Sequence, residues 1–218
     1  MKGTLYAVGV GPGDPELLTL KAIKTLLRAE VIACPAKGDA PGVAYRIAER
    51  AMPDLARKET LLLSFPMEKS GLAEAHEKAA ARIIERLEAG RHVALLTLGD
   101  PTLYATASYV IGLVRQAGHP VEIVSGVPSF CAAAARLCLP LAMGEDPLMI
   151  SPGTYRDFPG TLVVLKAGSR LKELKAELRD AGKAVCLVEN CGMENERVWS
   201  DLDAMPDETG YFSILIVK

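Results

Sequence analysis

"HVALLTLGDPTLYATASY", residues 92–109, runs from an apolar string into Gly-Asp-Pro and then into two tyrosines separated by small residues. A continuous apolar string is typical of a strand that is buried on both faces of a parallel sheet. The glycine and the proline are enough to end that strand and turn the chain. A purely structural turn has no need of Asp100, Tyr104 and Tyr109 as well. We therefore interpret the stretch as a strand that leads into a functional turn.

Apolar strings alternate with amphipathic patterns on the N-terminal side of this stretch. The strings begin at Thr4, Glu30 and Leu61. Helices are expected over Glu16–Arg28, Pro41–Met52 and Leu72–Ala89. In the first of these helices, Leu17, Leu20, Ile23 and Leu27 are expected to share one face. The alternation predicts an α/β domain whose mostly parallel sheet is covered by helices on both faces.

The C-terminal half has the same ingredients in a different order. Strands are expected from Val121, Thr161 and Ala184, and helices over Phe130–Leu137 and Leu171–Ala181. Two late strands, "ERVWS" and "YFSILIV", follow without a helix between them, which favours antiparallel pairing and a mixed sheet. Around "QAGHP", residues 116–120, one helix ends and a strand begins. The sequence thus predicts two α/β domains, residues 1–117 and 118–218.

Composition limits the classes of partner. The 218 residues are 50% hydrophobic and 24% charged, with a formal net charge of −2, which suffices for large buried cores. No basic run would attract nucleic acid or an anionic membrane, so neither is an expected partner. No apolar targeting or membrane-spanning stretch is seen, and we expect a cytoplasmic protein. The five cysteines include no pair at two-residue spacing, so neither disulfides nor a metal site are expected.

A glycine-rich turn, "GVGPGDPE" at residues 9–16, lies between the first strand and the first helix, where open α/β sheets bind ligands. A dinucleotide fingerprint would need a third glycine where Asp14 stands, and Pro12 removes a backbone donor for phosphate. A nicotinamide-dependent oxidoreductase is therefore disfavoured. The residues alone leave a ligand loop and a plain strand-to-helix turn equally open.

Three motifs together resemble the tetrapyrrole (corrin and porphyrin) methylases, which methylate ring carbons with S-adenosylmethionine. They are "GPGDPELLTLKA" (11–22), "VALLTLGDPTLYATASY" (93–109) and "VEIVSGVPSFCAAAARLCLPL" (121–141). The resemblance covers essentially the whole chain. Within the family, the first two motifs most resemble enzymes of cobalamin biosynthesis that act at carbon 20 of precorrin-2 or cobalt-precorrin-2. The resemblance implies a cleft between two α/β domains as the active site, S-adenosylmethionine as methyl donor, a small-molecule tetrapyrrole substrate and a homodimer.

The resemblance also implies roles for single residues. The residues implied to bind the cofactor are Pro12, Gly99, Asp100, Leu103, Pro128, Ser129, Lys166 and Asn190. Asp100 would hold the cofactor's ammonium group, and Tyr104 would lie beside the methyl donor, so these two are the expected catalytic residues. Lys166 stands where relatives commonly carry an apolar residue. The alternative is that Asp100 caps a helix starting at Pro101, with Tyr104 and Tyr109 in the core; for Tyr109 we favour the core.

Methyl transfer to a ring carbon depends mainly on alignment and exclusion of water, so no strong base is obligatory. We expect His76 on the polar face of its helix, and all three histidines to be structural or solvated. Because tetrapyrroles carry side-chain carboxylates, basic groups are expected near the substrate, and the candidates are Lys37, Lys69 and Arg156.

Several alternative functions remain open. They include methylation of another corrin carbon or of uroporphyrinogen, a diphthine-synthase-like activity, a ribosomal RNA methylase of the same fold, and a non-catalytic cofactor-binding module. The acidic balance disfavours the RNA enzyme. An assay of the product made from a methyl donor and a tetrapyrrole distinguishes the others.

Overall fold

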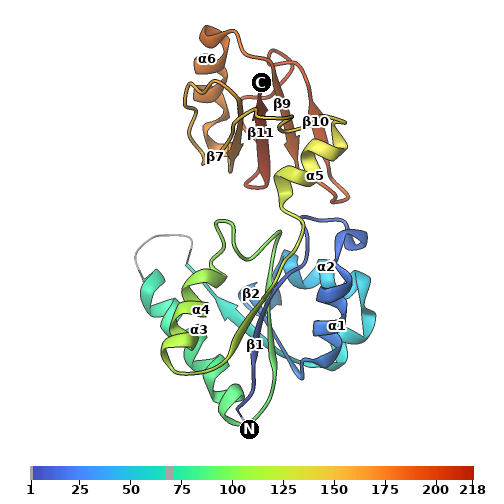
Figure 1. Ribbon diagram of the computed structural model, residues 1–218, viewed down its shortest axis with the longest axis vertical. Helices are drawn as coiled ribbons and strands as arrows, with labels where there is room; N and C mark the ends of the chain where they lie inside the picture. The colour runs from blue at the N-terminus through green and yellow to red at the C-terminus, as the bar shows by residue number, and fades with distance from the viewer. Residues whose placement is uncertain (1, 67–70) are drawn as a thin grey trace. The chain divides into compact units, whose positions relative to one another are not determined.

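A computed structural model describes residues 2–66 and 71–218 and divides the chain into two compact units, Met1–Pro128 and Ser129–Lys218 (Figure 1). The division falls later than the predicted boundary after residue 117. The reason is that β6 (Val121–Val124) pairs in parallel with β1 (Leu5–Gly9), and so belongs to the first unit's sheet.

The first unit is built on a mostly parallel sheet, as predicted. Its other strands are β2 (Val31–Lys37), β3 (Ala40–Pro41), β4 (Glu59–Ser64) and β5 (Val93–Thr97). The order is β3-β2-β5-β1-β6, with β4 paired to β2, and among the described strands of this unit only β3 runs antiparallel to its neighbour. Each central strand has hydrogen-bonded neighbours on both sides, and its unbroken apolar sequence reflects burial of both faces of the sheet in the two cores.

Helices cover both faces of this sheet (Figure 1). Strand residues such as Val8 and Ile32 pack into one core with α1 (Leu20–Arg28) and α2 (Val43–Ala51). Neighbouring strand residues such as Ala7 and Ala33 pack into the other core with α3 (Leu72–Glu88) and α4 (Ala107–Gln116). Two short 3-10 helices, Pro15–Leu17 and Pro53–Arg57, complete the unit.

The apolar face predicted for the first helix is wrong. Leu20 and Leu27 are 75% and 61% exposed, whereas the buried residues of α1 are Ala22, Thr25 and Leu26. Pro15–Leu17 form a separate 3-10 turn, and α1 starts only after Thr19, whose hydroxyl accepts a hydrogen bond from Ala22 N. Leu20 and Leu27 still share one face of α1, but the face that packs into the core is the one of Ala22, Thr25 and Leu26.

The second unit has the mixed sheet that the sequence predicts. Its strands are β7 (Leu148–Pro152), β8 (Thr161–Leu165), β9 (Val185–Glu189), β10 (Arg197–Trp199) and β11 (Ser213–Val217), in the order β10-β9-β11-β8-β7. Only β7 and β8 pair in parallel. Helix α6 has the predicted bounds, Leu171–Ala181, and packs against the sheet, whereas α5 (Ser129–Arg136) contacts β11. A short 3-10 helix, Gly168–Arg170, precedes α6.

In the described ranges, no helix is both long and apolar enough to cross a membrane.

Candidate functional site

Three strand ends meet at one edge of the first unit's sheet. β5, β1 and β6 are adjacent and parallel, so the turns that follow them all leave from the carboxyl edge. Two of these turns are joined directly: Gly99 N donates to Gly11 O at 2.8 Å, and Gly11 N donates to Gly99 O at 3.3 Å. The glycine-rich turn and the Gly-Asp-Pro turn therefore form one structure.

Glycine is required at this edge because three backbones approach one another closely. A methyl carbon placed on Gly126 would lie 2.1 Å from Gly99 O and 2.8 Å from Gly9 C. One placed on Gly9 would lie 2.6 Å from both Gly126 N and Gly99 O. Gly99 itself has a φ of +71°, a conformation that disfavours other residues. We call Gly9, Gly11, Gly99 and Gly126 the glycine junction.

Asp100 fastens the junction. Its Oδ1 accepts hydrogen bonds from Thr102 N at 2.8 Å and Thr102 Oγ1 at 2.5 Å, and its Oδ2 accepts one from Gly126 N at 3.0 Å. The residue is only 8% exposed. Burial raises the pKa of the carboxyl, but the hydrogen bonds from Thr102 and Gly126 outweigh it and leave the pKa below the ordinary value of 3.8. Asp100 is thus an ionised group that holds the β5 and β6 turns together.

The turn after Asp100 does not start a helix. Residues 101–106 form turns, Tyr104 has a φ of +49°, and α4 begins only at Ala107. The expectation of a helix from Pro101 is therefore wrong, and Asp100 is not its cap. Leu103 is half-buried, whereas Tyr104 is 51% exposed and so does not belong to the core.

Tyr109 is also on the surface, contrary to the core position favoured from the sequence. It is 65% exposed, and its ring stacks on His76 with centroids 4.7 Å apart and planes 7° apart. The expectation that His76 lies on a polar helix face is wrong, since it is 8% exposed and its Nε2 has no hydrogen-bond partner. The exposed tyrosine covers the histidine.

The other histidines have structural surroundings. His92 Nδ1 accepts a hydrogen bond from Thr4 N at 3.0 Å, and His119 is buried directly after α4. One further polar group is relevant to the junction: Thr97 Oγ1, at the end of β5, is buried and has no partner.

Left-handed backbone occurs at few non-glycine residues in the described chain: Tyr104, Cys138, Lys166 and Asn190. Three of these four are residues that the resemblance assigns to the site. Such conformations cost energy and gather at functional sites, so the observation favours a functional role for Tyr104, Lys166 and Asn190 without indicating which ligand each one contacts. Of the remaining assigned residues, Pro12 is buried, and Pro128 and Ser129, which adjoin the division between the units, are half-buried.

In the second unit, Lys166 and Asn190 follow β8 and β9, the two neighbours of β11, and so lie at one edge of that sheet. Asn190 N donates to Phe212 O at 2.9 Å. Lys166 is exposed, and its Nζ lies 5.3 Å from the centroid of the Tyr211 ring. Tyr211 was not among the site residues predicted from the sequence, which placed it only as the first residue of the strand "YFSILIV".

Glu189, at the end of β9, supports this edge through its side chain. It is 3% exposed; its Oε1 accepts a hydrogen bond from Gly210 N at 2.6 Å, and its Oε2 accepts one from Arg197 Nε at 2.8 Å. These bonds fix the turn that carries Tyr211 against the end of β9.

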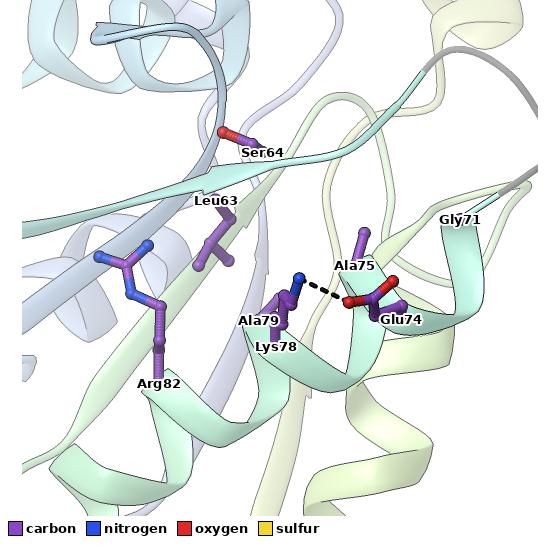
Figure 2. A pocket seen from close by; sticks show the side chains of 8 residues that line it. All are labelled: Leu63, Ser64, Gly71, Glu74, Ala75, Lys78, Ala79 and Arg82. Atoms are coloured by element: carbon purple, nitrogen blue, oxygen red, sulfur yellow. Dashed lines mark ion pairs between the residues drawn. The ribbon is translucent and has the colours of Figure 1, made fainter.

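A hollow of about 360 Å³ lies in the first unit between the end of β4 and the start of α3 (Figure 2). Two side chains on its wall, Lys78 and Glu74, form an ion pair at 2.6 Å. None of the residues assigned to the site lines it. Of the basic candidates, Lys37 and Arg156 are exposed, and Lys69 lies outside the described residues.

The cysteines are free, and burial raises the pKa of the Cys34 and Cys191 thiols to about 11. Within the described residues, no group of three or more His, Cys, Asp or Glu side chains is placed to hold a metal ion.

Comparison with known proteins gives consistent matches over nearly the whole chain. The family model for Tetrapyrrole (Corrin/Porphyrin) Methylases matches residues 4–205. A probable cobalt-precorrin-2 C(20)-methyltransferase of Methanocaldococcus jannaschii is 35% identical over 98% of this chain and 95% of its own. A precorrin-2 C(20)-methyltransferase of Sinorhizobium sp is 32% identical over 99% of this chain and 95% of its own.

A solved structure agrees with these matches. The uroporphyrin-III C-methyl transferase from Thermus thermophilus, complexed with S-adenyl homocysteine, has a TM-score of 0.71 and 26% identity over 99% of this chain and 92% of that chain. Because the family model and the relatives both extend over both units, the similarity is not confined to a shared glycine loop. The chain belongs to the tetrapyrrole methylases.

Proposed function

We propose that the protein is an S-adenosylmethionine-dependent methyltransferase of cobalamin biosynthesis, which methylates carbon 20 of precorrin-2 or cobalt-precorrin-2. Relatives of that name match over nearly the full length of both chains. The structural observation that carries the proposal is the glycine junction, a set of tightly packed turns at the carboxyl edge of a parallel sheet, where open α/β sheets bind ligands.

The residues of this edge fit the cofactor. Its methionine part is small and polar and carries an ammonium group, and the junction holds an ionised carboxylate, Asp100, on closely packed backbone. We propose that Pro12, Gly99, Asp100, Leu103, Pro128, Ser129 and Asn190 bind the cofactor and that Tyr104 lies beside the methyl group. Both oxygens of Asp100 already accept hydrogen bonds from the chain, so the main role of Asp100 is to position the turn. Its negative charge in addition attracts the cationic cofactor.

The cofactor, when bound, supplies a methyl group on a sulfonium. The chain must align that group with one ring carbon and keep water away, which requires rigid surroundings more than a strong base. The junction meets this requirement, because its turns are tied to one another by backbone and carboxylate hydrogen bonds. Tyr104, held in a left-handed conformation, presents its ring from a fixed backbone.

The test is to incubate the protein with a methyl donor labelled with carbon-13 and with precorrin-2 or its cobalt form, and to locate the label by nuclear magnetic resonance. We expect one new methyl group, at carbon 20. A label at another ring carbon would contradict the assignment within the family, and no transfer to any tetrapyrrole would favour a non-catalytic binding module.

We also propose a homodimer that acts in the cytoplasm without nucleic-acid or membrane partners, as the family resemblance implies. Light scattering of the purified chain measures its oligomeric state, and a monomeric mass in the active enzyme would contradict the proposed homodimer.

A further inference from the structure

Lys166 and Tyr211 form an exposed pair at one edge of the second unit's sheet. The Lys166 ammonium lies 5.3 Å from the centroid of the Tyr211 ring, within the range of a cation–π contact. Tyr211 is 55% exposed, and its ring meets Phe212 edge-on, with centroids 5.4 Å apart and planes at 80°. No ion pair in the described part of the chain includes Lys166, so its charge is not neutralised by a carboxylate of the protein.

The backbone beneath this pair is fixed on both sides. Gly210 N donates to the buried Glu189, and Ser213 Oγ donates to Gly210 O at 2.7 Å. Gly168 packs so closely on the same turn that a methyl carbon there would lie 2.2 Å from Gly210 O. The segment that carries Tyr211 is therefore held by the ends of β9 and β8 and by the start of β11.

The conformation of Lys166 is not explained by the pair itself. Its φ of +57° is unfavourable for a lysine, and an exposed cation–π contact stabilises by no more than such a conformation costs. A residue that serves only the fold would gain nothing from this arrangement. A flat apolar ring beside an uncompensated cation on rigid backbone is, however, suited to a flat ligand that carries negative charge.

We propose that Lys166 binds a side-chain carboxylate of the tetrapyrrole and that Tyr211 packs against the neighbouring apolar part of that substrate. This inference rests on the proposed function and reassigns Lys166 from the cofactor to the substrate. The charges decide between the two ligands. S-adenosylmethionine carries two positive groups, a sulfonium and an ammonium, and one carboxylate, so a lysine opposes its binding. A tetrapyrrole carries several carboxylates, so a lysine attracts it.

The test compares Lys166→Met, Lys166→Arg and Tyr211→Ala with the matched control Lys172→Met, which removes an exposed lysine from α6. Lys166→Met should raise the KM for the tetrapyrrole about fivefold to tenfold, because it removes the charged hydrogen bond to the substrate. Lys166→Arg should raise the KM less, because arginine keeps the positive charge. Tyr211→Ala should also raise it. The Kd of S-adenosylhomocysteine, measured by calorimetry, should stay within about twofold of the wild type in all variants.

Tetrapyrrole binding is also measured without a methyl donor, by absorbance titration with uroporphyrin III at low and high salt. Salt should weaken binding to the wild type more than binding to Lys166→Met. A weaker affinity for S-adenosylhomocysteine with an unchanged tetrapyrrole KM would overturn the proposal, as would an effect of Lys172→Met equal to that of Lys166→Met. If the wild type binds uroporphyrin III through Lys166 but methylates no tetrapyrrole, the proposed reaction fails and the carboxylate site stands. If the wild type binds no tetrapyrrole, both fail.

Discussion

Replacing Asp100 by Asn tests whether this carboxylate holds the glycine junction together. Asparagine keeps one acceptor oxygen and puts an NH2 donor in place of the other. If its oxygen faces Thr102, the new donor points at Gly126 N, which lies 3.0 Å from the present oxygen. If the amide is reversed, Thr102 N loses its partner instead. In either orientation one backbone donor beside an 8% exposed side chain is left unpaired.

The expected cost is about 2 to 4 kcal/mol of unfolding free energy: an unpaired buried donor costs about 1 to 3 kcal/mol, and conversion of the remaining charge-assisted bond to a neutral one adds about 1 kcal/mol. The cost should depend on pH. The pKa of Asp100 in the folded protein lies below 3.8, so its stabilisation is complete above that value and is lost as the pH falls through the folded-state pKa. The difference between wild type and Asp100→Asn should therefore be full near neutrality and should narrow below pH 3.8.

Urea unfolding followed by circular dichroism measures the free energy, and hydrogen exchange of the segment 93–128 locates the change. Asp39→Asn, a change of an exposed aspartate in the same unit, is the matched control and should leave stability unaltered. Calorimetry with S-adenosylhomocysteine completes the design. An Asp100→Asn protein as stable as wild type but with weakened cofactor binding would refute the positioning role and support direct contact with the ammonium group.

Three further substitutions, the first with a matched control, follow from the same structure. Gly126→Ala should abolish cofactor binding and lower the melting temperature, since the added carbon would lie 2.1 Å from a backbone oxygen. The control Gly112→Ala lies in open space on α4 and should instead stabilise the protein by about 0.5 to 1 kcal/mol. Similar melting temperatures for the two variants would contradict the steric reasoning. Glu189→Gln keeps an acceptor but loses the ion pair with Arg197, and should cost about 1 to 3 kcal/mol in chemical denaturation, whereas an unchanged midpoint would mean that this pair, with its buried carboxylate and exposed arginine, is dispensable. His76→Phe removes a buried nitrogen without a partner and should raise stability by about 1 kcal/mol; a loss measured by calorimetric melting would show that the nitrogen is satisfied in solution.

Local patterns predicted the elements well where nothing interrupts them. The bounds of α6 agree with the structure, and the apolar strings at β1, β2 and β5 are central strands. The buried face of α1 was missed because Leu20 and Leu27 have helical spacing but are exposed, whereas Ala22, Thr25 and Leu26 pack into the core. The spacing of apolar residues shows which of them share a face, but it does not show which face meets the sheet.

The sequence predicted the kind of site better than it predicted the contacts between the residues of the site. The family resemblance led to Gly99 and Asp100, but not to Gly126, because the contact between Gly126 and Asp100 joins two turns that only the sheet brings together. Tyr211 was missed for a similar reason, since nothing in "YFSILIV" indicates that Lys166, which follows β8, lies over its ring. Sequence patterns report the period of an element, whereas partners across a sheet depend on strand order.

The late position of β6 in the chain has a consequence for synthesis. When the ribosome has released residues through Ala117, all four α-helices of the first unit have emerged, but β6, which borders β1, has not. Until Val121–Val124 arrive, β1 presents a row of unpaired amides and carbonyls to any neighbouring strand, and the carboxylate of Asp100 lacks its bond from Gly126. The nascent chain is thus most open to aggregation just before its first unit is complete. A fragment ending at residue 117 would keep that exposed edge permanently, whereas one ending at residue 128 would close it.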